Sequence, residues 1–179
     1  MNIMFNKLFE IDKVSDSIEK INFREAVRGI IIKDKKILMV HSKNKDYKFP
    51  GGGMKKDEGH IDALKREVEE ETGYVCSKIG DQLGIITERS KDKYVNNRVF
   101  KMISYYYLAE VSNVRKAQKL DPYEAKLKFR PEWIQIEDAI NNNEKIISSG
   151  VETIPNWIFR ETYVLKVIRD YINRFNKIT

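Results

Sequence analysis

Apolar positions along the chain follow a strand-like pattern through the middle and a helical pattern towards the end. Short runs rich in β-branched and aromatic residues predict strands at 24–33, 36–41, 82–88, 98–111 and 132–136. Apolar positions three and four residues apart predict helices at 60–72 and about 155–176, and a short helix from about Glu137. Gly59 and Gly73 flank the first helix as plausible caps. This order of elements predicts a mixed α/β fold.

The size and composition suit one compact domain. The chain has 179 residues, of which 41% are hydrophobic and 34% charged. We therefore expect a single domain over 1–179, with a core at about 24–142, an N-terminal extension and a C-terminal helix. No apolar run approaches the roughly 20 residues of a membrane span, and residues 1–9 make a poor signal peptide. We expect a cytoplasmic protein without a membrane partner. The single cysteine, Cys76, excludes an intrachain disulfide and a cysteine-based metal cluster.

Charge is unevenly distributed along the chain. Residues 54–72 carry four basic and seven acidic side chains, a net charge of −3, which leaves +9 for the rest of a chain whose total is +6. A basic body around an acidic segment suits a polyanionic substrate held at a metal site, and it would also suit weak nucleic-acid binding. A lysine-rich surface that only aids solubility is the alternative interpretation.

The acidic residues of the helix at 60–72 gather on one face. At about 100° per residue, Glu70 and Glu71 fall within about 60° of Glu67, so three carboxylates repel one another. Arg66 offsets part of this repulsion, and oxygen ligands of this kind are what Mg²⁺ or Mn²⁺ prefers. A solvated acidic face or half of a charged interface fits the spacing equally well. By contrast, Glu69 points away from the three carboxylates, and we expect it to form a surface pair with Lys65, while Ile61, Leu64 and Val68 anchor the helix.

A run of glycines precedes this helix by a short loop. Pro50-Gly51-Gly52-Gly53 interrupts the preceding strand pattern. Glycines let the backbone come close to a ligand, so a carbonyl group of this loop could complete the coordination of an ion. A tight turn at the end of a strand is the alternative.

Loop and helix together form a longer pattern, which resembles the Nudix box. The box asks for Gly, five residues, Glu, seven residues, Arg-Glu, an apolar residue, any residue, Glu-Glu, any residue, Gly and an apolar residue. The chain matches its specified positions with Gly52, Glu58, Arg66, Glu67, Glu70, Glu71 and Gly73. Two departures are Tyr74, where aliphatic residues are commoner, and Asp57, where many members have glycine. The resemblance extends over about residues 24–142.

The resemblance implies a fold and a chemistry. The fold is a Nudix α/β/α sandwich, with a mixed curved sheet between helices. The reaction is Mg²⁺-dependent cleavage of a phosphoanhydride bond in a nucleoside diphosphate-linked substrate or a nucleoside triphosphate, with Mn²⁺ as a second suitable ion. The metal ligands it implies are Glu67, Glu70 and Glu71, a supporting or ligating Glu58, and the carbonyl group of Gly52.

The resemblance also implies a catalytic set. Glu67 and Glu70 take part in catalysis, and Arg66 orients the glutamates. In some members one of these glutamates is the base, and in others the base lies on a later loop. Glu88 is a candidate of the latter kind, although we favour a surface carboxylate for it.

The substrate is less well marked. In the Nudix family, a proline downstream of the box marks enzymes of ADP-ribose, but this chain has no proline between Pro50 and Pro122. A downstream tyrosine marks enzymes of dinucleoside polyphosphates, but Lys91 and Asp92 stand at its position. These absences disfavour ADP-ribose and dinucleoside polyphosphates, and no coenzyme A signature precedes the glycines. Arg28, in mid-strand, and Lys48, before the glycine loop, are candidate phosphate contacts. Stacking on a base is open to four aromatic residues, for which we favour core packing: Tyr105, Tyr106, Tyr107 and Trp133.

Two other functions remain open. The first is a Nudix-like domain that senses a nucleotide without cleaving it, which the intact Glu67, Glu70 and Glu71 disfavour. The second is a pyrophosphohydrolase of RNA 5′ ends, although the sequence contains no clear nucleic-acid motif and we do not expect nucleic acid as a partner. His41 and His60 have no partner at ligand spacing, so we expect neither to bind metal. The long final helix could mediate a homodimer.

Overall fold

The computed structural model describes residues 3–12, 20–150 and 154–175. Among these residues no helix is long and apolar enough to cross a membrane. The strands are β1 (Phe5–Glu10), β2 (Ile21–Ile30), β3 (Ile32–Lys33), β4 (Lys36–His41), β5 (Tyr47–Lys48), β6 (Tyr74–Lys91), β7 (Val99–Arg115) and β8 (Arg130–Gln135). The helices are α1 (His60–Thr72), α2 (Pro122–Lys126), α3 (Ile136–Ser148) and α4 (Trp157–Phe175).

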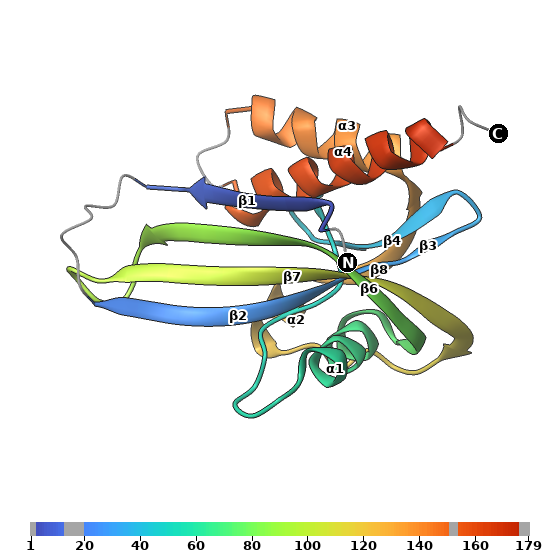
Figure 1. Ribbon diagram of the computed structural model, residues 1–179, viewed down its shortest axis with the longest axis horizontal. Helices are drawn as coiled ribbons and strands as arrows, with labels where there is room; N and C mark the ends of the chain where they lie inside the picture. The colour runs from blue at the N-terminus through green and yellow to red at the C-terminus, as the bar shows by residue number, and fades with distance from the viewer. Residues whose placement is uncertain (1–2, 13–19, 151–153, 176–179) are drawn as a thin grey trace.

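The described strands form two sheets. The first has the order β1-β6-β7-β2 and is mixed, because β1 runs parallel to β6 and β2 parallel to β7, whereas β6 and β7 are antiparallel. The second is antiparallel and joins β3, β4, β5 and β8. Helices α3 and α4 lie on one side of the strands and α1 on the other (Figure 1). The expected α/β/α sandwich with mixed strand order is confirmed, with the strands divided between two sheets.

Each side of the sandwich has its own apolar cluster. On the side of α3 and α4, the fully buried Tyr106 packs with Ile86 and Leu165. On the side of α1, Leu64 and Val68 pack among buried residues of the strands, as their spacing predicts. Ile61 is 41% exposed, so its expected anchoring role is wrong. It lies in the first turn of α1, ahead of the part of the helix that meets this cluster.

Alternation along β7 explains the three consecutive tyrosines. Tyr106 points into the core, as expected, while its neighbours lie half-buried on the opposite face. There the hydroxyl of Tyr105 donates to Glu25, and that of Tyr107 donates to Gln82. Side-chain partners therefore satisfy both phenols without a ligand.

Strand lengths differ from the sequence prediction. β6 begins directly after α1, at Tyr74, and its first half contains several register shifts against β7. Such irregularities break the two-residue alternation on which strand prediction depends. β1 lies in the N-terminal extension, for which the sequence pattern predicts no element. It is an exposed edge strand whose Phe5 packs where Gly84 of β6 leaves room for the ring.

Candidate metal centre

Helix α1 carries the acidic residues, and its two ends match the sequence prediction. It follows Gly59 and is capped by Gly73, whose φ of 73° is left-handed and whose N–H donates to the carbonyl oxygen of Glu69 at 2.8 Å. The three carboxylates on the predicted face lie in different environments. Glu67 is 8% exposed and Glu71 fully buried, whereas the side chain of Glu70 is 32% exposed.

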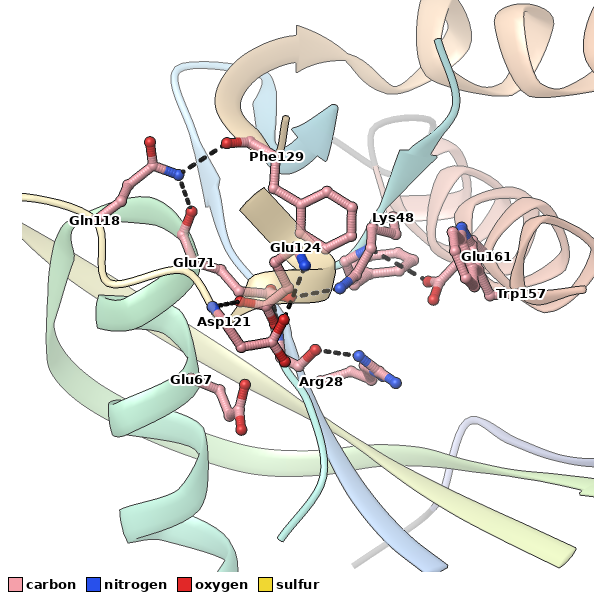
Figure 2. Close-up of polar contacts among 12 residues, drawn as sticks. Arg28, Lys48, Glu67, Glu71, Gln118, Asp121, Glu124, Phe129, Trp157 and Glu161 are labelled. Atoms are coloured by element: carbon pink, nitrogen blue, oxygen red, sulfur yellow. Dashed lines mark hydrogen bonds and ion pairs between the residues drawn. The ribbon is translucent and has the colours of Figure 1, made fainter. Parts of the chain in front are cut away.

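The structure adds a carboxylate that the sequence analysis did not single out. Glu124, from α2, lies opposite the two buried glutamates of α1 (Figure 2). One carboxylate oxygen from each of Glu67, Glu71 and Glu124 lies within 4.8 Å of the others. Asp121-Pro-Tyr-Glu124 is a capping box, a local signal that predicts the start of a helix but no contact with α1.

Two carboxylates of this cluster have raised pKa values, mainly because they are buried. Burial raises the pKa of Glu67, with a further contribution from the nearby Glu71. Burial also raises the pKa of Glu124 to about 7, with added repulsion from Glu71 and Asp121. Three carboxylate oxygens that lie this close together fit a hard divalent cation. The residues present therefore suit the ion that the Nudix box implies.

Gly52 lies against one of these carboxylates. A Cβ atom at this position would stand 2.2 Å from Oε2 of Glu67, so a larger residue would displace the carboxylate. The carbonyl group of Gly52 accepts a hydrogen bond from the N–H of Val27 at 3.0 Å. A carbonyl oxygen has a second lone pair, which stays available for a cation. Its ligand role remains a prediction.

Arg66 connects the other acidic residues of the box. Its guanidinium meets Glu58 through two bonds of 2.7 Å, and Nη1 reaches Glu67 at 2.6 Å and Glu70 at 3.1 Å. The hydrogen bonds from Arg66 lower the pKa of Glu58 to about 2. Arg66 thus contacts three glutamates at once, and its role in orienting them remains a prediction. Glu69 pairs with Lys116 at 2.8 Å, so the expected partner Lys65 is wrong, because the chain after β7 returns past the end of α1.

Two buried cations lie next to the glycine loop. Lys48 forms an ion pair with Glu71, which also accepts the N–H of Gly51 at 2.8 Å. Arg28 donates to the carbonyl oxygen of Gly51 (Figure 2). Both side chains face protein groups, and their contact with substrate phosphates remains a prediction.

Other residues from the sequence analysis have partners elsewhere in the fold. Glu88 is 4% exposed and bound to Arg160, so the expected surface position is wrong. It lies on the face of β6 that α4 covers, which the sequence of β6 alone does not reveal. Nδ1 of His60 lies 2.7 Å from the hydroxyl of Tyr107. The indole of Trp133 is half-buried and donates to the hydroxyl of Tyr74 at 2.9 Å.

Two known proteins are similar to part of this chain. A protein of Methanocaldococcus jannaschii named ADP-ribose pyrophosphatase is 39% identical over 71 residues, which cover 37% of this chain and 41% of that protein. One of Buchnera aphidicola subsp. Schizaphis graminum named 8-oxo-dGTP diphosphatase is 32% identical over 90 residues, covering 48% and 55%. The chain thus spans about half the length of these relatives.

Structural comparison gives the same fold. A NUDIX hydrolase from Nitrosomonas europaea superposes with a TM-score of 0.58 at 20% identity, covering 85% of this chain and 90% of that one. The family model for the NUDIX domain matches residues 22–156, which include the glycine loop, α1 and α2. The chain therefore belongs to the Nudix domain family.

Proposed function

We propose that this chain is a Mg²⁺-dependent hydrolase that cleaves a phosphoanhydride bond in a nucleoside diphosphate-linked substrate or a nucleoside triphosphate. The observation that carries the proposal is the meeting of Glu67, Glu71 and Glu124 within 4.8 Å. Gly52 closes one side of this cluster, and Arg66 ties Glu58 and Glu70 to it through Glu67.

The proposed ligands come from the box. They are the carboxylates of Glu58, Glu67, Glu70 and Glu71 and the carbonyl oxygen of Gly52. A bound Mg²⁺, or Mn²⁺ in its place, would neutralise the charge of substrate phosphates and of the leaving group. The protein's own part is to hold the carboxylates close together. Arg66 fixes three of them, and Lys48 with the N–H of Gly51 fixes Glu71.

Glu124 is the proposed proton acceptor for the attacking water. Burial raises the pKa of Glu124 to about 7 without a bound cation. A cation beside it would lower this pKa, so the carboxylate would be ionised and able to accept a proton. Its carboxylate adjoins Glu67 and Glu71, so a water activated there would lie beside the proposed ion. As the water oxygen bonds to phosphorus, the bridging P–O bond breaks and its oxygen leaves with the electron pair on the departing phosphate. One proton of the water passes to Glu124.

The substrate class rests on the box and on the names of the relatives. One relative is named for ADP-ribose and the other for 8-oxo-dGTP. Both names describe nucleotides that contain a phosphoanhydride bond. They differ in the group that the diphosphate carries. We therefore propose cleavage of a phosphoanhydride bond, and the experiment below distinguishes a sugar-linked nucleotide from a triphosphate as the substrate.

The decisive experiment measures release of phosphate or nucleotide from a substrate panel. The panel contains nucleoside triphosphates including 8-oxo-dGTP, nucleotide sugars, ADP-ribose, dinucleoside polyphosphates and a short RNA with a 5′ triphosphate, each with Mg²⁺ and with EDTA. We expect turnover of one class, abolished by EDTA. Turnover that persists in EDTA would contradict the metal centre. Metal-dependent binding without turnover would identify a sensor, and cleavage of the RNA alone would identify an enzyme of RNA 5′ ends.

A further inference from the structure

Helix α4 holds the segment that leads into the glycine loop. Oε2 of Glu161 accepts the backbone N–H of Phe49 at 3.3 Å, and the indole Nε1 of Trp157 donates to Oδ2 of Asp46 at 2.7 Å. These two contacts lie one helical turn apart on α4 and at opposite ends of residues 46–49. Helix α4 therefore forms hydrogen bonds with both ends of a segment that contains β5.

The same segment supplies the groups that hold Glu71. Lys48 pairs with its Oε1, and Gly51, two residues past Phe49, donates its N–H to its Oε2. A continuous set of contacts thus runs from α4 through β5 to the carboxylate cluster (Figure 2). A shift of the segment would move both partners of Glu71, and Gly52 with them.

Glu161 sits among charges that fix its position. It is fully buried, and its Oε1 accepts Nη2 of Arg160 at 3.0 Å. Arg160 also binds Glu88, so this arginine has a second carboxylate to balance it. The remaining oxygen of Glu161 points at the N–H of Phe49. A neutral side chain could accept that hydrogen bond, but it would leave Arg160 and the neighbouring Arg28 with less compensating charge.

We propose that Glu161 and Trp157 are positioning residues of the metal centre, which act on it through β5 and the glycine loop. The inference rests on the proposed function of that centre. Outer contacts of this kind fix the orientation of metal ligands, and their loss typically costs about 10- to 100-fold in metal affinity or activity. Helix α4 is then part of the active site, although none of its described residues belongs to the carboxylate cluster.

The test compares three variants of the full chain. Each is titrated with Mn²⁺ well below its unfolding temperature, and electron paramagnetic resonance measures how much Mn²⁺ is bound. Trp157→Phe keeps an aromatic ring and removes only the donor to Asp46. Glu161→Gln keeps an acceptor for Phe49 but removes the charge that pairs with Arg160, so it tests whether this pair holds the acceptor in place. Asp170→Asn is the control, because its exposed carboxylate lies on the same helix and pairs with Arg169. We expect both test variants to bind Mn²⁺ about 10-fold more weakly or worse, and the control to bind like the wild type.

A second measurement reports on the loop itself. The amide NMR signals of Gly51 and Gly52 should shift in both test variants and stay in place in Asp170→Asn. A purely structural role would lower the unfolding temperature while leaving the Mn²⁺ affinity and these two signals unchanged, which would overturn the inference. If Glu161→Gln does not fold, Trp157→Phe decides the question alone.

A further variant separates this inference from the proposed function. Glu67→Gln removes a proposed ligand and should abolish Mn²⁺ binding at the centre. If Glu67→Gln binds Mn²⁺ like the wild type, the metal centre itself is wrong. If Glu67→Gln loses binding while Trp157→Phe and Glu161→Gln retain it, the centre is right and only the positioning role is wrong.

Discussion

Arg66 and Glu58 meet side by side, with Nε 2.7 Å from Oε1 and Nη2 2.7 Å from Oε2. Parallel bonds of this kind combine charge with a fixed geometry that lysine cannot reproduce. They also tie the loop before α1 to the helix, since Glu58 precedes the helix and Arg66 lies within it. The box spacing between these two residues therefore has a structural reason, apart from the catalytic role that we propose.

The pairing predicts a pH dependence of stability. The pKa of Glu58 falls from its ordinary 4.5 to about 2 in the folded protein. A lowered pKa means that the charged form stabilises the fold above pH 4.5, and that this stabilisation is lost as the pH falls towards 2. Glu58→Gln should therefore lower the free energy of unfolding by about 1–2 kcal/mol at pH 7. Denaturant unfolding at several pH values should show this difference shrinking below pH 4.5. A difference that stays constant from pH 7 to 3 would contradict the assigned pairing.

Gly51 and Gly52 should respond differently to the same substitution. A Cβ at Gly51 would stand 2.1 Å from the carbonyl oxygen of Val27, at a φ of 138° that disfavours alanine. Gly51→Ala should therefore lower the unfolding temperature strongly. The three atoms nearest to a Cβ at Gly52 all belong to the carboxylate of Glu67, which is the end of a side chain rather than backbone. Gly52→Ala should keep an unfolding temperature near that of the wild type and lose Mn²⁺ affinity. Equal thermal destabilisation of both variants would contradict this division.

The sequence predicts the part of the site that lies on neighbouring turns. Helical spacing places Glu67, Glu70 and Glu71 on one face, and the box adds Gly52 and Glu58. It does not predict that Glu71 is buried against Lys48, because burial depends on how β5 packs beside α1. The order of the elements predicts a mixed α/β fold, and the resemblance to the Nudix box adds the α/β/α sandwich. The division into two sheets depends on tertiary pairing.

The features of the site that the sequence does not predict depend on contacts between distant segments of the chain. Glu124 follows a capping signal that any surface helix could carry, and only the folded chain brings it opposite α1. The apolar spacing of the final helix predicts a face that packs, which Val164 and Leu165 confirm. That spacing gives no indication that Glu161 turns inward to the backbone of Phe49. The single-domain boundaries and the homodimer remain predictions.

Glu124→Gln tests the proposed proton acceptor. Glutamine can keep the capping box with Asp121, so folding should be preserved. Loss of a general base typically costs about 10²- to 10⁴-fold in rate, and we expect kcat to fall by that amount. Loss of a residue that contacts a metal ligand typically weakens metal binding by about 10- to 100-fold. Because Glu124 is not a proposed ligand, we expect the Mn²⁺ affinity to change by less than about 10-fold. The matched control is Glu110→Gln, an exposed carboxylate paired with Lys78. Unchanged kcat would remove Glu124 from the reaction, and loss of Mn²⁺ binding would make it a ligand instead.

Glu70 and Glu69 are adjacent on α1, but we expect their substitution by glutamine to affect activity differently. Glu70 lies on the face of Glu67 and shares Nη1 of Arg66 with it. Glu69 pairs with Lys116 on the surface. Glu70→Gln should cost about 100-fold or more in kcat and weaken Mn²⁺ binding, because its loss should exceed the typical effect of an outer contact.

The neighbouring variant, Glu69→Gln, carries the same chemical change on the same helix. It should retain activity and lose less than about 1 kcal/mol of stability, as is usual for an exposed ion pair. Mg²⁺-dependent turnover of both variants on the substrate identified by the panel checks the pair. Full activity in Glu70→Gln would show that the proposed ligand set is wrong. An equal loss in both variants would show that the charge of α1 as a whole, rather than the face turned to Glu67, is what the reaction needs.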